Sequence, residues 1–322
     1  MRALLVVNPN ATTTSRRTRE VLAAALEHEL KLEVARTDRR GHATELASQA
    51  LVDGVDLVVV LGGDGTVNEV VNGLLADGPH ADLPDLAVVP GGGTNVFARA
   101  LGIPEDPVEA TGVLLEALQA GDRRTIGLGR ADDRWFTFCA GLGLDAEVVA
   151  SIDRRRHAGA PAAWHYVAHA VRAFYLGADR RHPALTVDAP GVPVTPGVFL
   201  AIVANTSPWT YLGNRPLQPC PDATFESGLD LYAVRRLRTA AGLRQVRQLL
   251  GKPRPGGPRG RQVLTGHDLA HLTISADRPV AFQVDGEPLG ERSQVTFTAH
   301  PQALRVVCQK TPEIPADQRP NG

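Results

Sequence analysis

The feature that most constrains the fold is an apolar strand that leads directly into a glycine-rich turn and then a helix. Residues 56–61 read Asp-Leu-Val-Val-Val-Leu, and Gly62-Gly63-Asp64-Gly65-Thr66 follows at once. A continuous β-branched run of this kind is typical of a central strand in a parallel sheet that is covered on both faces. Valine and leucine then recur at helical spacing from residue 67 to 75, which predicts a helix packed on that sheet. The order of these three elements predicts an α/β fold.

The turn itself favours phosphate and metal. Glycines at 62, 63 and 65 permit positive φ and let bare N–H groups approach a ligand, and the N-terminus of the next helix favours an anion. Thr66 and Glu69 have capping-box spacing, so we expect the helix to begin at Thr66. A carboxylate beside phosphates repels them unless a cation lies between, so Asp64 indicates Mg²⁺. The motif alone leaves open a plain turn in which Asp64 only caps the helix.

The remaining chain divides into two expected domains and a tail. Up to residue 130, strand and helix patterns alternate, as an α/β layer requires. From 131 to 310 we expect short strands with Gly and Pro turns, typical of a β-sandwich, with helical insertions at 145–177 and 240–251. Residues 311–322 are expected to be a disordered tail. The expected strands are 3–7, 32–34, 56–61, 86–89, 134–140, 184–189, 197–205, 229–235, 271–276, 280–285, 294–299 and 303–308, and the other helices are 15–30, 42–52 and 94–101.

Composition excludes several classes of protein. The chain has 34 basic and 35 acidic residues, so no global field argues for nucleic acid. Its three cysteines are far apart with no C-x-x-C pair, which argues against zinc and disulfides and favours a reducing cytoplasm. No run approaches eighteen apolar residues, so any membrane contact is expected to be peripheral. Basic residues between 244 and 261 either bind anionic headgroups or are simply solvated.

Other polar groups are expected near the first turn. Asn8 and Thr37 follow two strands at the same carboxyl edge of the sheet, where α/β proteins bind ligands. Residues 91–95, Gly-Gly-Gly-Thr-Asn, form a second glycine turn before a helix, so two helix N-termini are expected to share one polyphosphate. Far downstream, Asp285 and Glu287 place two carboxylates on a turn after a strand.

Together these segments resemble the diacylglycerol kinase catalytic-domain family, which includes bacterial lipid kinases and the sphingosine and ceramide kinases. Their order and spacing match the family over most of the chain. The segments that carry the resemblance are Asn8-Pro9, Gly62 to Thr66 with Asn68-Glu69, Pro90 to Asn95 with Phe97-Ala98-Arg99, Gly141 to Ala146, and Asp285-Gly286-Glu287.

The resemblance implies an N-terminal nucleotide-binding α/β domain and a C-terminal β-sandwich, with ATP, Mg²⁺ and a lipid meeting between them. It implies catalytic roles for Asp285, Asp64 and Glu287, and metal contact by Asp64 and Asp285. The bacterial branch places its general base at Asp285, which we favour, whereas Asp64 is the base argued for sphingosine kinases. The residues implied to contact the nucleotide are Asn8, Thr37, Gly62, Gly63, Asp64, Gly65, Thr66, Asn68, Gly93, Thr94 and Asn95.

Two positions depart from the family pattern. Val96 replaces a carboxylate near the phosphates, and Ser227 replaces an aspartate that holds a structural Mg²⁺ in bacterial relatives. A hydroxyl binds Mg²⁺ far less well than a carboxylate, which argues against that second metal site.

We therefore expect an ATP- and Mg²⁺-dependent lipid kinase of phospholipid metabolism, acting on diacylglycerol or a similar lipid. It is expected in the cytoplasm, peripheral at the inner face of the membrane, without nucleic acid, and with a homodimer left open. The alternatives are an NAD kinase, which uses a similar Gly-Gly-Asp-Gly-Thr turn, and a non-catalytic nucleotide or lipid sensor on the same scaffold.

Overall fold

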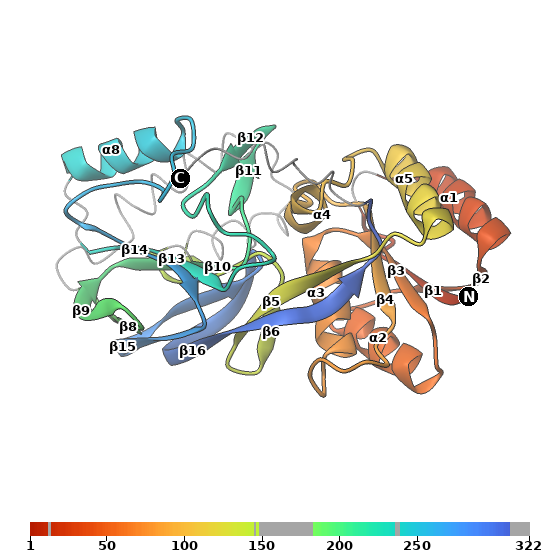
Figure 1. Cartoon of the computed structure of the whole chain (residues 1–322), viewed down its shortest axis with the longest axis horizontal. Helices are drawn as coiled ribbons and strands as arrows, with labels where there is room; N and C mark the ends of the chain where they lie inside the picture. Colours follow the sequence, from red (N-terminus) through yellow and green to blue (C-terminus); the bar gives the residue numbers. More distant parts are fainter. Residues whose placement is uncertain (12–13, 145, 148–182, 236–238, 310–322) are drawn as a thin grey trace, which may run out of the picture.

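The computed structural model, shown in Figure 1, describes the 322-residue chain except residues 12–13, 145, 148–182, 236–238 and 310–322. The expected helical insertion at 145–177 lies almost entirely outside the described residues, and the expected tail at 311–322 lies wholly outside them. No helix in the described part of the chain is long and apolar enough to cross a bilayer.

The N-terminal layer is a parallel sheet with helices on both faces. Its strands run in the order β2-β1-β3-β4, all parallel. The helices α1 and α5 lie on one face, and α2 and α3 lie on the other (Figure 1). The strands are β1 (Arg2–Val7), β2 (Lys31–Arg36), β3 (Leu57–Gly62) and β4 (Asp85–Pro90). The helices are α1 (Arg16–Glu29), α2 (His42–Val52), α3 (Asp64–Leu74), α4 (Val96–Ala100) and α5 (Pro107–Ala120).

This strand order creates a switch point between β1 and β3. The chain leaves β1 toward β2 on one side and returns to β3 on the other, and open α/β sheets bind ligands at the carboxyl end of such a point. Asn8 follows β1 and Gly63 follows β3, and the Asn8 amide donates to the Leu61 carbonyl at 3.0 Å. The glycine turn and Asn8 therefore lie together at the switch point.

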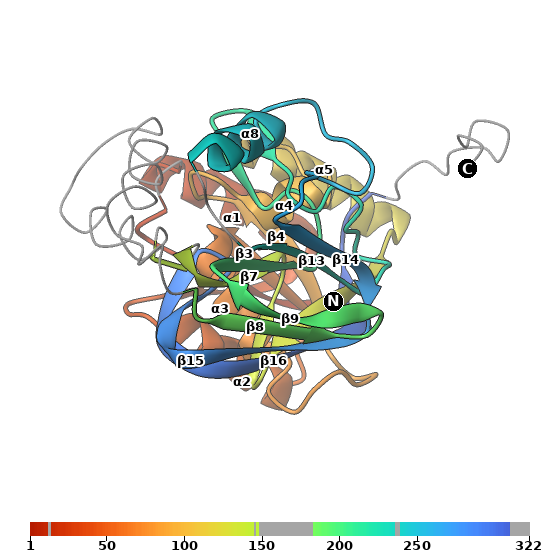
Figure 2. The same cartoon turned by 90° about the vertical axis from the view of Figure 1, so that its left-hand side faces the viewer.

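The rest of the chain is rich in antiparallel strands, as Figure 2 shows from the side. The sheet continues in the order β14-β13-β10-β7-β15-β16, and Val306 at the end of β16 pairs in parallel with Leu86 of β4. The last strand thus joins the two layers. The described strands are β5 (Arg124–Ala131), β6 (Arg134–Phe136), β7 (Cys139–Gly143), β8 (Leu185–Ala189), β9 (Val192–Val198), β10 (Leu200–Ala204), β11 (Thr210–Leu212), β12 (Arg215–Leu217), β13 (Leu229–Val234), β14 (Val263–Leu269), β15 (His271–Val284) and β16 (Glu287–Val306), and the helix α8 (Thr239–Leu249) is described among them.

Several predicted boundaries were wrong. The four expected strands after residue 270 are two long ones, β15 and β16, because their pairing continues through register shifts between Ser275 and Val280 and between His300 and Leu304. The expected strand 197–205 divides at Phe199 into β9 and β10. Helix α5 was not predicted, although Asp106 caps it and a glycine at 121 ends it. The division into domains at residue 130 stays a prediction.

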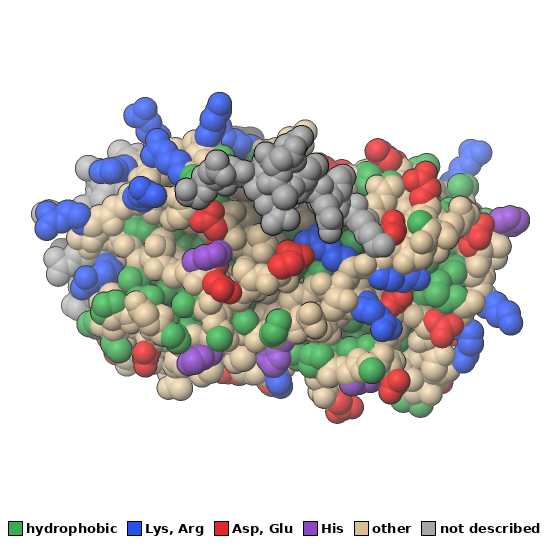
Figure 3. All heavy atoms as spheres, viewed as in Figure 1, with side chains coloured by type: hydrophobic (Ala, Val, Ile, Leu, Met, Phe, Trp, Pro, Cys, Tyr) green, Lys and Arg blue, Asp and Glu red, His purple; other side chains and the backbone are tan. Residues whose placement is uncertain are grey.

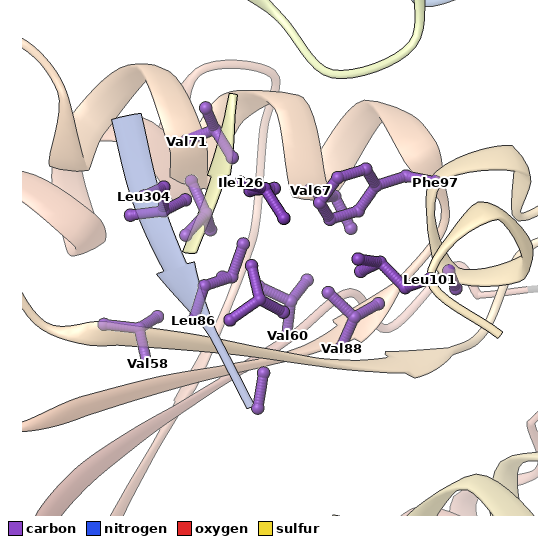
Figure 4. Packing of buried hydrophobic residues seen from close by; sticks show 14 of the residues in the cluster. Val58, Val60, Val67, Val71, Leu86, Val88, Phe97, Leu101, Ile126 and Leu304 are labelled. Carbon is purple, nitrogen blue, oxygen red and sulfur yellow. The ribbon is translucent and has the colours of Figure 1, made fainter. Parts of the chain in front are cut away.

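One core spans both layers and holds α3 in place (Figure 4). Val60 of β3 and Leu86 of β4 meet Val67 of α3, and all three are at most 2 % exposed. Ile126 of β5 and Leu304 of β16 pack into the same cluster. Full burial of such a side chain contributes roughly 1.5–3 kcal/mol. The helix that begins at the glycine turn is therefore anchored to strands from both halves of the chain.

Candidate active site

The two glycine turns pack directly against each other. The Gly91 amide donates to the Gly62 carbonyl at 2.8 Å. A Cβ added at Gly92 would lie 2.7 Å from the Cα of Gly63, closer than real contacts allow. Gly62, Gly63 and Gly65 do not adopt positive φ, contrary to our expectation. Glycine is needed at 63 and 92 because two backbones meet there.

The outer rim of the turns is open. Gly65 and Gly93 are exposed, and a Cβ at either position would meet no atom within 4 Å. Neither close packing nor backbone strain requires glycine at these positions. Open glycines beside a helix N-terminus leave room for a ligand to contact the backbone.

Asp64 is the first residue of α3, two residues earlier than the predicted helix start. Its carboxylate accepts the amides of Val96 at 3.0 Å and Phe97 at 3.1 Å, so it caps α4. The charge of Asp64 is stabilised by the positive end of that helix. The first two amides of α4 therefore bind a carboxylate. We had expected the N-terminus of this helix to bind a polyphosphate together with the N-terminus of α3.

Asn95 shapes the second turn. It adopts a left-handed conformation with φ of 48°, and its side chain makes hydrogen bonds in both directions with the backbone of Gly92. The Gly92 amide donates to Oδ1 at 2.9 Å, and Nδ2 donates to the Gly92 carbonyl at 2.7 Å. In the structure Asn95 is thus a buried turn residue, which directs Val96 and Phe97 toward Asp64.

One face of α3 carries Asp64, Asn68 and Asn72 at intervals of four residues, and this face meets the β-rich half of the molecule. Asn68 is 1 % exposed. Its Nδ2 donates to Asp285 Oδ2 at 2.8 Å and to the Trp135 carbonyl at 2.9 Å. Its Oδ1 accepts Nη2 of Arg134 at 2.5 Å. The structure therefore places Asn68 in a buried contact between the two halves.

Asp285 lies in a cage of five donors and is 5 % exposed. Oδ2 accepts the Thr137 amide at 2.7 Å, the Thr137 hydroxyl at 2.8 Å and Asn68 Nδ2. Oδ1 accepts the amides of Phe138 at 3.0 Å and Cys139 at 3.1 Å. Burial raises the pKa of Asp285, while the hydrogen bonds from residues 137–139 oppose that rise. The outcome is a buried carboxylate that holds a proton more readily than an ordinary aspartate.

Glu287 begins β16 and forms ion pairs that were not predicted from the sequence. Its Oε1 lies 2.9 Å from Nε of Arg40, in the loop before α2, and its Oε2 lies 3.5 Å from Nη2 of Arg134. The Glu287 side chain is 14 % exposed, so it is no solvated hairpin residue. No motif includes Arg40 or Arg134, and only their pairing with distant residues marks them.

The other predicted nucleotide contacts follow strands at the same edge of the sheet as the first turn. Asn8 Nδ2 donates to the Thr66 hydroxyl at 3.0 Å, which ties the end of β1 to α3. Thr37 continues from β2, where its amide donates to the Val7 carbonyl at 2.9 Å. Thr94 is partly exposed beside Gly93. These residues lie at the edge of the sheet where we expected them.

The predicted capping box is wrong. The Glu69 carboxylate accepts the amides of Gly41 at 2.8 Å and Ala43 at 3.1 Å, so it caps α2. Thr66 lies inside α3, and its hydroxyl serves Asn8. A tertiary contact between neighbouring helices has replaced the local contact that the spacing suggested.

The residues present fit one carboxylate contact to Mg²⁺. Mg²⁺ usually takes one or two carboxylates and completes its shell with phosphate oxygens and water. Asp64 suits this role because it is only partly buried and lies beside the open rim. Asp285 does not fit as a ligand in this conformation, because five donors meet the roughly four acceptor positions of a carboxylate. Within the described residues there is no group of three or more His, Cys, Asp or Glu side chains that could hold a metal.

The segment with Ser227 is closed by its own hydroxyl. Ser227 Oγ donates to the Thr224 carbonyl at 3.0 Å and accepts the Thr224 amide at 3.2 Å. A neutral group thus bridges this loop.

Fold and site define a kinase-like protein, with a parallel α/β layer, paired glycine turns and a β-rich second half. The family described as the diacylglycerol kinase catalytic domain matches residues 2–131, and the YegS C-terminal NAD kinase beta sandwich-like domain matches residues 139–308. The chain belongs to the diacylglycerol kinase catalytic-domain family, a family of kinases. The predicted family and the predicted α/β plus β-sandwich fold are confirmed.

Relatives agree with this assignment, and solved structures share the fold. The chain is 31% identical over 273 residues to a probable lipid kinase YegS-like of Stenotrophomonas maltophilia, covering 82% of each chain. It is 43% identical over 110 residues to a diacylglycerol kinase of Bacillus subtilis, a match that spans 34% of each chain. A putative diacylglycerol kinase from Bacillus anthracis has the same fold, with a TM-score of 0.73, 21% identity and coverage of 96% and 97%. An NAD kinase from Archaeoglobus fulgidus is more distant, with a TM-score of 0.51, 12% identity and coverage of 95% and 93%.

Proposed function

We propose that the protein is an ATP- and Mg²⁺-dependent lipid kinase that transfers the γ-phosphate to a hydroxyl of diacylglycerol or a similar lipid. The observation that carries the proposal is the packing of the two glycine turns, which sets Asp64 beside an open rim at the switch point of the sheet. Catalysis of phosphoryl transfer is mostly positioning and neutralisation of charge, and this geometry suits both.

The nucleotide would bind at the rim. Gly65 and Gly93 leave its phosphates access to the backbone, and the N-terminus of α3 attracts their charge. Asp64 would hold Mg²⁺, which neutralises phosphate charge and orients the γ-phosphate when it is bound. Asn8 and Thr94 flank the same space. Asp64 is itself fixed by two α4 amides, so the metal contact would be preorganised.

Asp285 would act as the general base. Four of its five hydrogen-bond donors come from residues 137–139, and the fifth, the side-chain Nδ2 of Asn68, comes from the N-terminal layer. A lipid hydroxyl that displaced Asn68 would donate to the same Oδ2. Its oxygen would then bond to the γ-phosphorus as the bond to ADP breaks, and its proton would pass to Asp285. Burial raises the pKa of this carboxylate and so strengthens it as a base. The alternative base, Asp64, would leave Asp285 with a purely structural role.

The lipid substrate implies that the enzyme works peripherally at the inner face of the membrane. ATP as phosphate donor follows from the family. The NAD kinase alternative shares the Gly-Gly-Asp-Gly-Thr turn but has a distant similarity of fold, and the Asn68-Glu69-x-x-Asn72-Gly73 continuation favours the lipid branch. Val96 and Ser227 motivate the sensor alternative.

One experiment tests the proposal against both rivals. The protein is incubated with γ-labelled ATP and Mg²⁺, either with total membrane lipid or with NAD, and the product is identified by mass spectrometry. We expect label in one lipid class and none in NAD. Asp285→Asn should lower turnover at least about a hundredfold. Label in NAD would establish the first rival, and tight ATP binding with no phosphorylated product would establish the second.

A further inference from the structure

The positive charge of the chain is strongly segregated. Residues 235–266 contain nine arginines and lysines and no aspartate or glutamate. The remaining 290 residues therefore hold 25 basic residues, 34 − 9, against all 35 acidic ones. The overall net charge of −1 conceals one segment of +9 within a chain that is otherwise −10.

In the described part of the chain, the cations of this segment lie on one side of the second half of the molecule. Seven of them are described, and all seven are exposed: Arg235, Arg244, Arg247, Lys252, Arg254, Arg259 and Arg261. None of the seven forms an ion pair with another residue that the structure describes. We call these seven residues the basic face.

Hydrogen bonds hold the basic face together. Gln245 of α8 is 8 % exposed, and its Oε1 accepts the Tyr232 hydroxyl of β13 at 3.3 Å, which turns Arg244 and Arg247 outward. Gln248 binds the backbone of Arg259 twice, at 2.9 and 3.0 Å. The loop after α8 is thereby tied back to the helix. The cations form one surface instead of a loose loop.

The basic face lies on the same side of the molecule as the elements around the candidate site. Figure 3 shows Lys and Arg side chains gathered over α8. Figures 1 and 2 share a vertical axis, and both place α8 at the top and α4 in the upper half of the molecule. Between them, the β11 residue Tyr211 stacks on Arg99 of α4, with the guanidinium carbon 3.3 Å from the ring centroid.

These observations point to one kind of partner. We propose that the basic face docks the protein on anionic phospholipid and so holds the candidate site close to the membrane. Each cation near an anionic bilayer strengthens binding by a factor of about five. Val246, 40 % exposed between Arg244 and Arg247, adds an apolar side chain to the same face. Residues 235–266 contain no aromatic side chain for stacking on bases, which favours lipid over single-stranded nucleic acid.

The test compares two charge-matched variants. The first is the triple variant Arg247→Gln, Lys252→Gln and Arg254→Gln. The control is Arg16→Gln, Arg17→Gln and Lys31→Gln, which removes three exposed cations from the N-terminal layer. Binding is measured without ATP by co-sedimentation with phosphatidylcholine vesicles, at low and high salt. One set of vesicles contains about 30% phosphatidylglycerol, roughly a physiological charge density, and the other set contains none. A nucleic-acid arm uses a single-stranded oligonucleotide.

We expect the unchanged protein to bind anionic vesicles and to lose that binding as salt rises. The basic-face variant should bind at least about tenfold more weakly, while the control keeps most of its affinity. Equal loss in both variants, binding that ignores salt or phosphatidylglycerol, or a preference for the oligonucleotide would overturn the inference.

Its link to catalysis rests on the proposed function and is tested separately. Phosphorylation of a short-chain diacylglycerol below its aggregation limit needs no membrane, so the basic-face variant should retain full turnover there and lose it only on vesicles. A protein that binds vesicles as expected but phosphorylates neither substrate would refute the proposed function alone. Normal turnover by the variant on anionic vesicles would refute docking alone.

Discussion

Asn68 Nδ2 lies 2.8 Å from Asp285 Oδ2, which joins the second turn of α3 to the turn between β15 and β16 across 217 residues of sequence. Both side chains are buried, and the same asparagine also accepts a hydrogen bond from Arg134. A change at Asn68 therefore acts on the proposed base and on the Arg134–Glu287 ion pair together.

Asn68→Leu should lower kcat at least about tenfold and change the KM for ATP by less than about threefold, because leucine places an apolar side chain where the lipid hydroxyl must reach Asp285 Oδ2 and leaves the rim intact. Steady-state kinetics on the lipid substrate measure both constants. Asn72→Leu is the control, since Asn72 also contacts Trp135 at this boundary but makes no direct hydrogen bond to Asp285. An increase in the KM for ATP with kcat unchanged would instead show that Asn68 contacts the nucleotide, as the family resemblance implied.

The pH dependence should follow the cage of Asp285. A base must be ionised, so activity falls as pH drops through its pKa, and burial has already raised that pKa. Thr137→Val removes a hydroxyl that lowers the pKa of Asp285, so the acid limb of the rate profile should move to higher pH. Thr137→Ser keeps the hydroxyl and should leave the limb in place. Identical limbs in both variants would show that another group is the base.

The same raised pKa affects stability with a definite sign. A carboxyl whose pKa is higher in the folded state than in the unfolded state favours folding below the unfolded pKa, and this contribution is lost as pH rises through the folded pKa. We expect Thr137→Val to steepen the loss of stability with rising pH at mildly acidic values, relative to Thr137→Ser. Denaturant titrations at a series of pH values measure the difference, and parallel pH profiles would contradict it.

Local patterns predicted most of the first half of the fold, with α5 as the exception, because the information for these elements is local. The apolar run before Gly62 and the helical spacing from His42 to Val52 correspond closely to β3 and α2. The capping-box prediction for Glu69 was wrong because its carboxylate accepts the backbone amides of Gly41 and Ala43 instead of an amide of its own helix. Spacing along one segment cannot show which neighbouring segment will supply a partner.

The candidate site was predicted by residue type but not by arrangement. Turn residues were expected at the sheet edge because every parallel strand ends there. The cage around Asp285 forms only where β6, β7 and α3 come together. No sequence pattern within any of these elements predicts that they contact one another. Arg40 and Arg134 were missed for the same reason, since each is an ordinary arginine until the fold brings Glu287 to it.

Asp64 should combine two functions that substitutions can separate. Asp64→Ala leaves the Val96 and Phe97 amides without their cap, so unfolding should become easier by about 0.5–2 kcal/mol. Asp64→Asn keeps one acceptor oxygen and most of that stability but loses the charge that would hold Mg²⁺. We expect turnover to fall at least about a hundredfold in both variants. In Asp64→Asn, the Mg²⁺ concentration needed for activity should also be higher. Turnover that followed stability alone would reduce Asp64 to a helix cap.

The two kinds of glycine in the turns offer the sharpest test of where phosphates bind. Gly92→Ala forces a Cβ to within 2.7 Å of the Gly63 Cα, so the protein should lose about 1–3 kcal/mol of stability. Gly65→Ala meets no protein atom within 4 Å and lies in the first turn of α3, where alanine should be neutral or stabilising by up to about 1 kcal/mol. If ATP lies against the rim, the new methyl group of Gly65→Ala occupies its space and raises the Kd for ATP while thermal stability is kept. Calorimetric titration with ATP and Mg²⁺, beside a denaturant melt, reads both quantities. Unchanged ATP affinity in Gly65→Ala would place the nucleotide elsewhere, because steric damage to the fold is absent at this position.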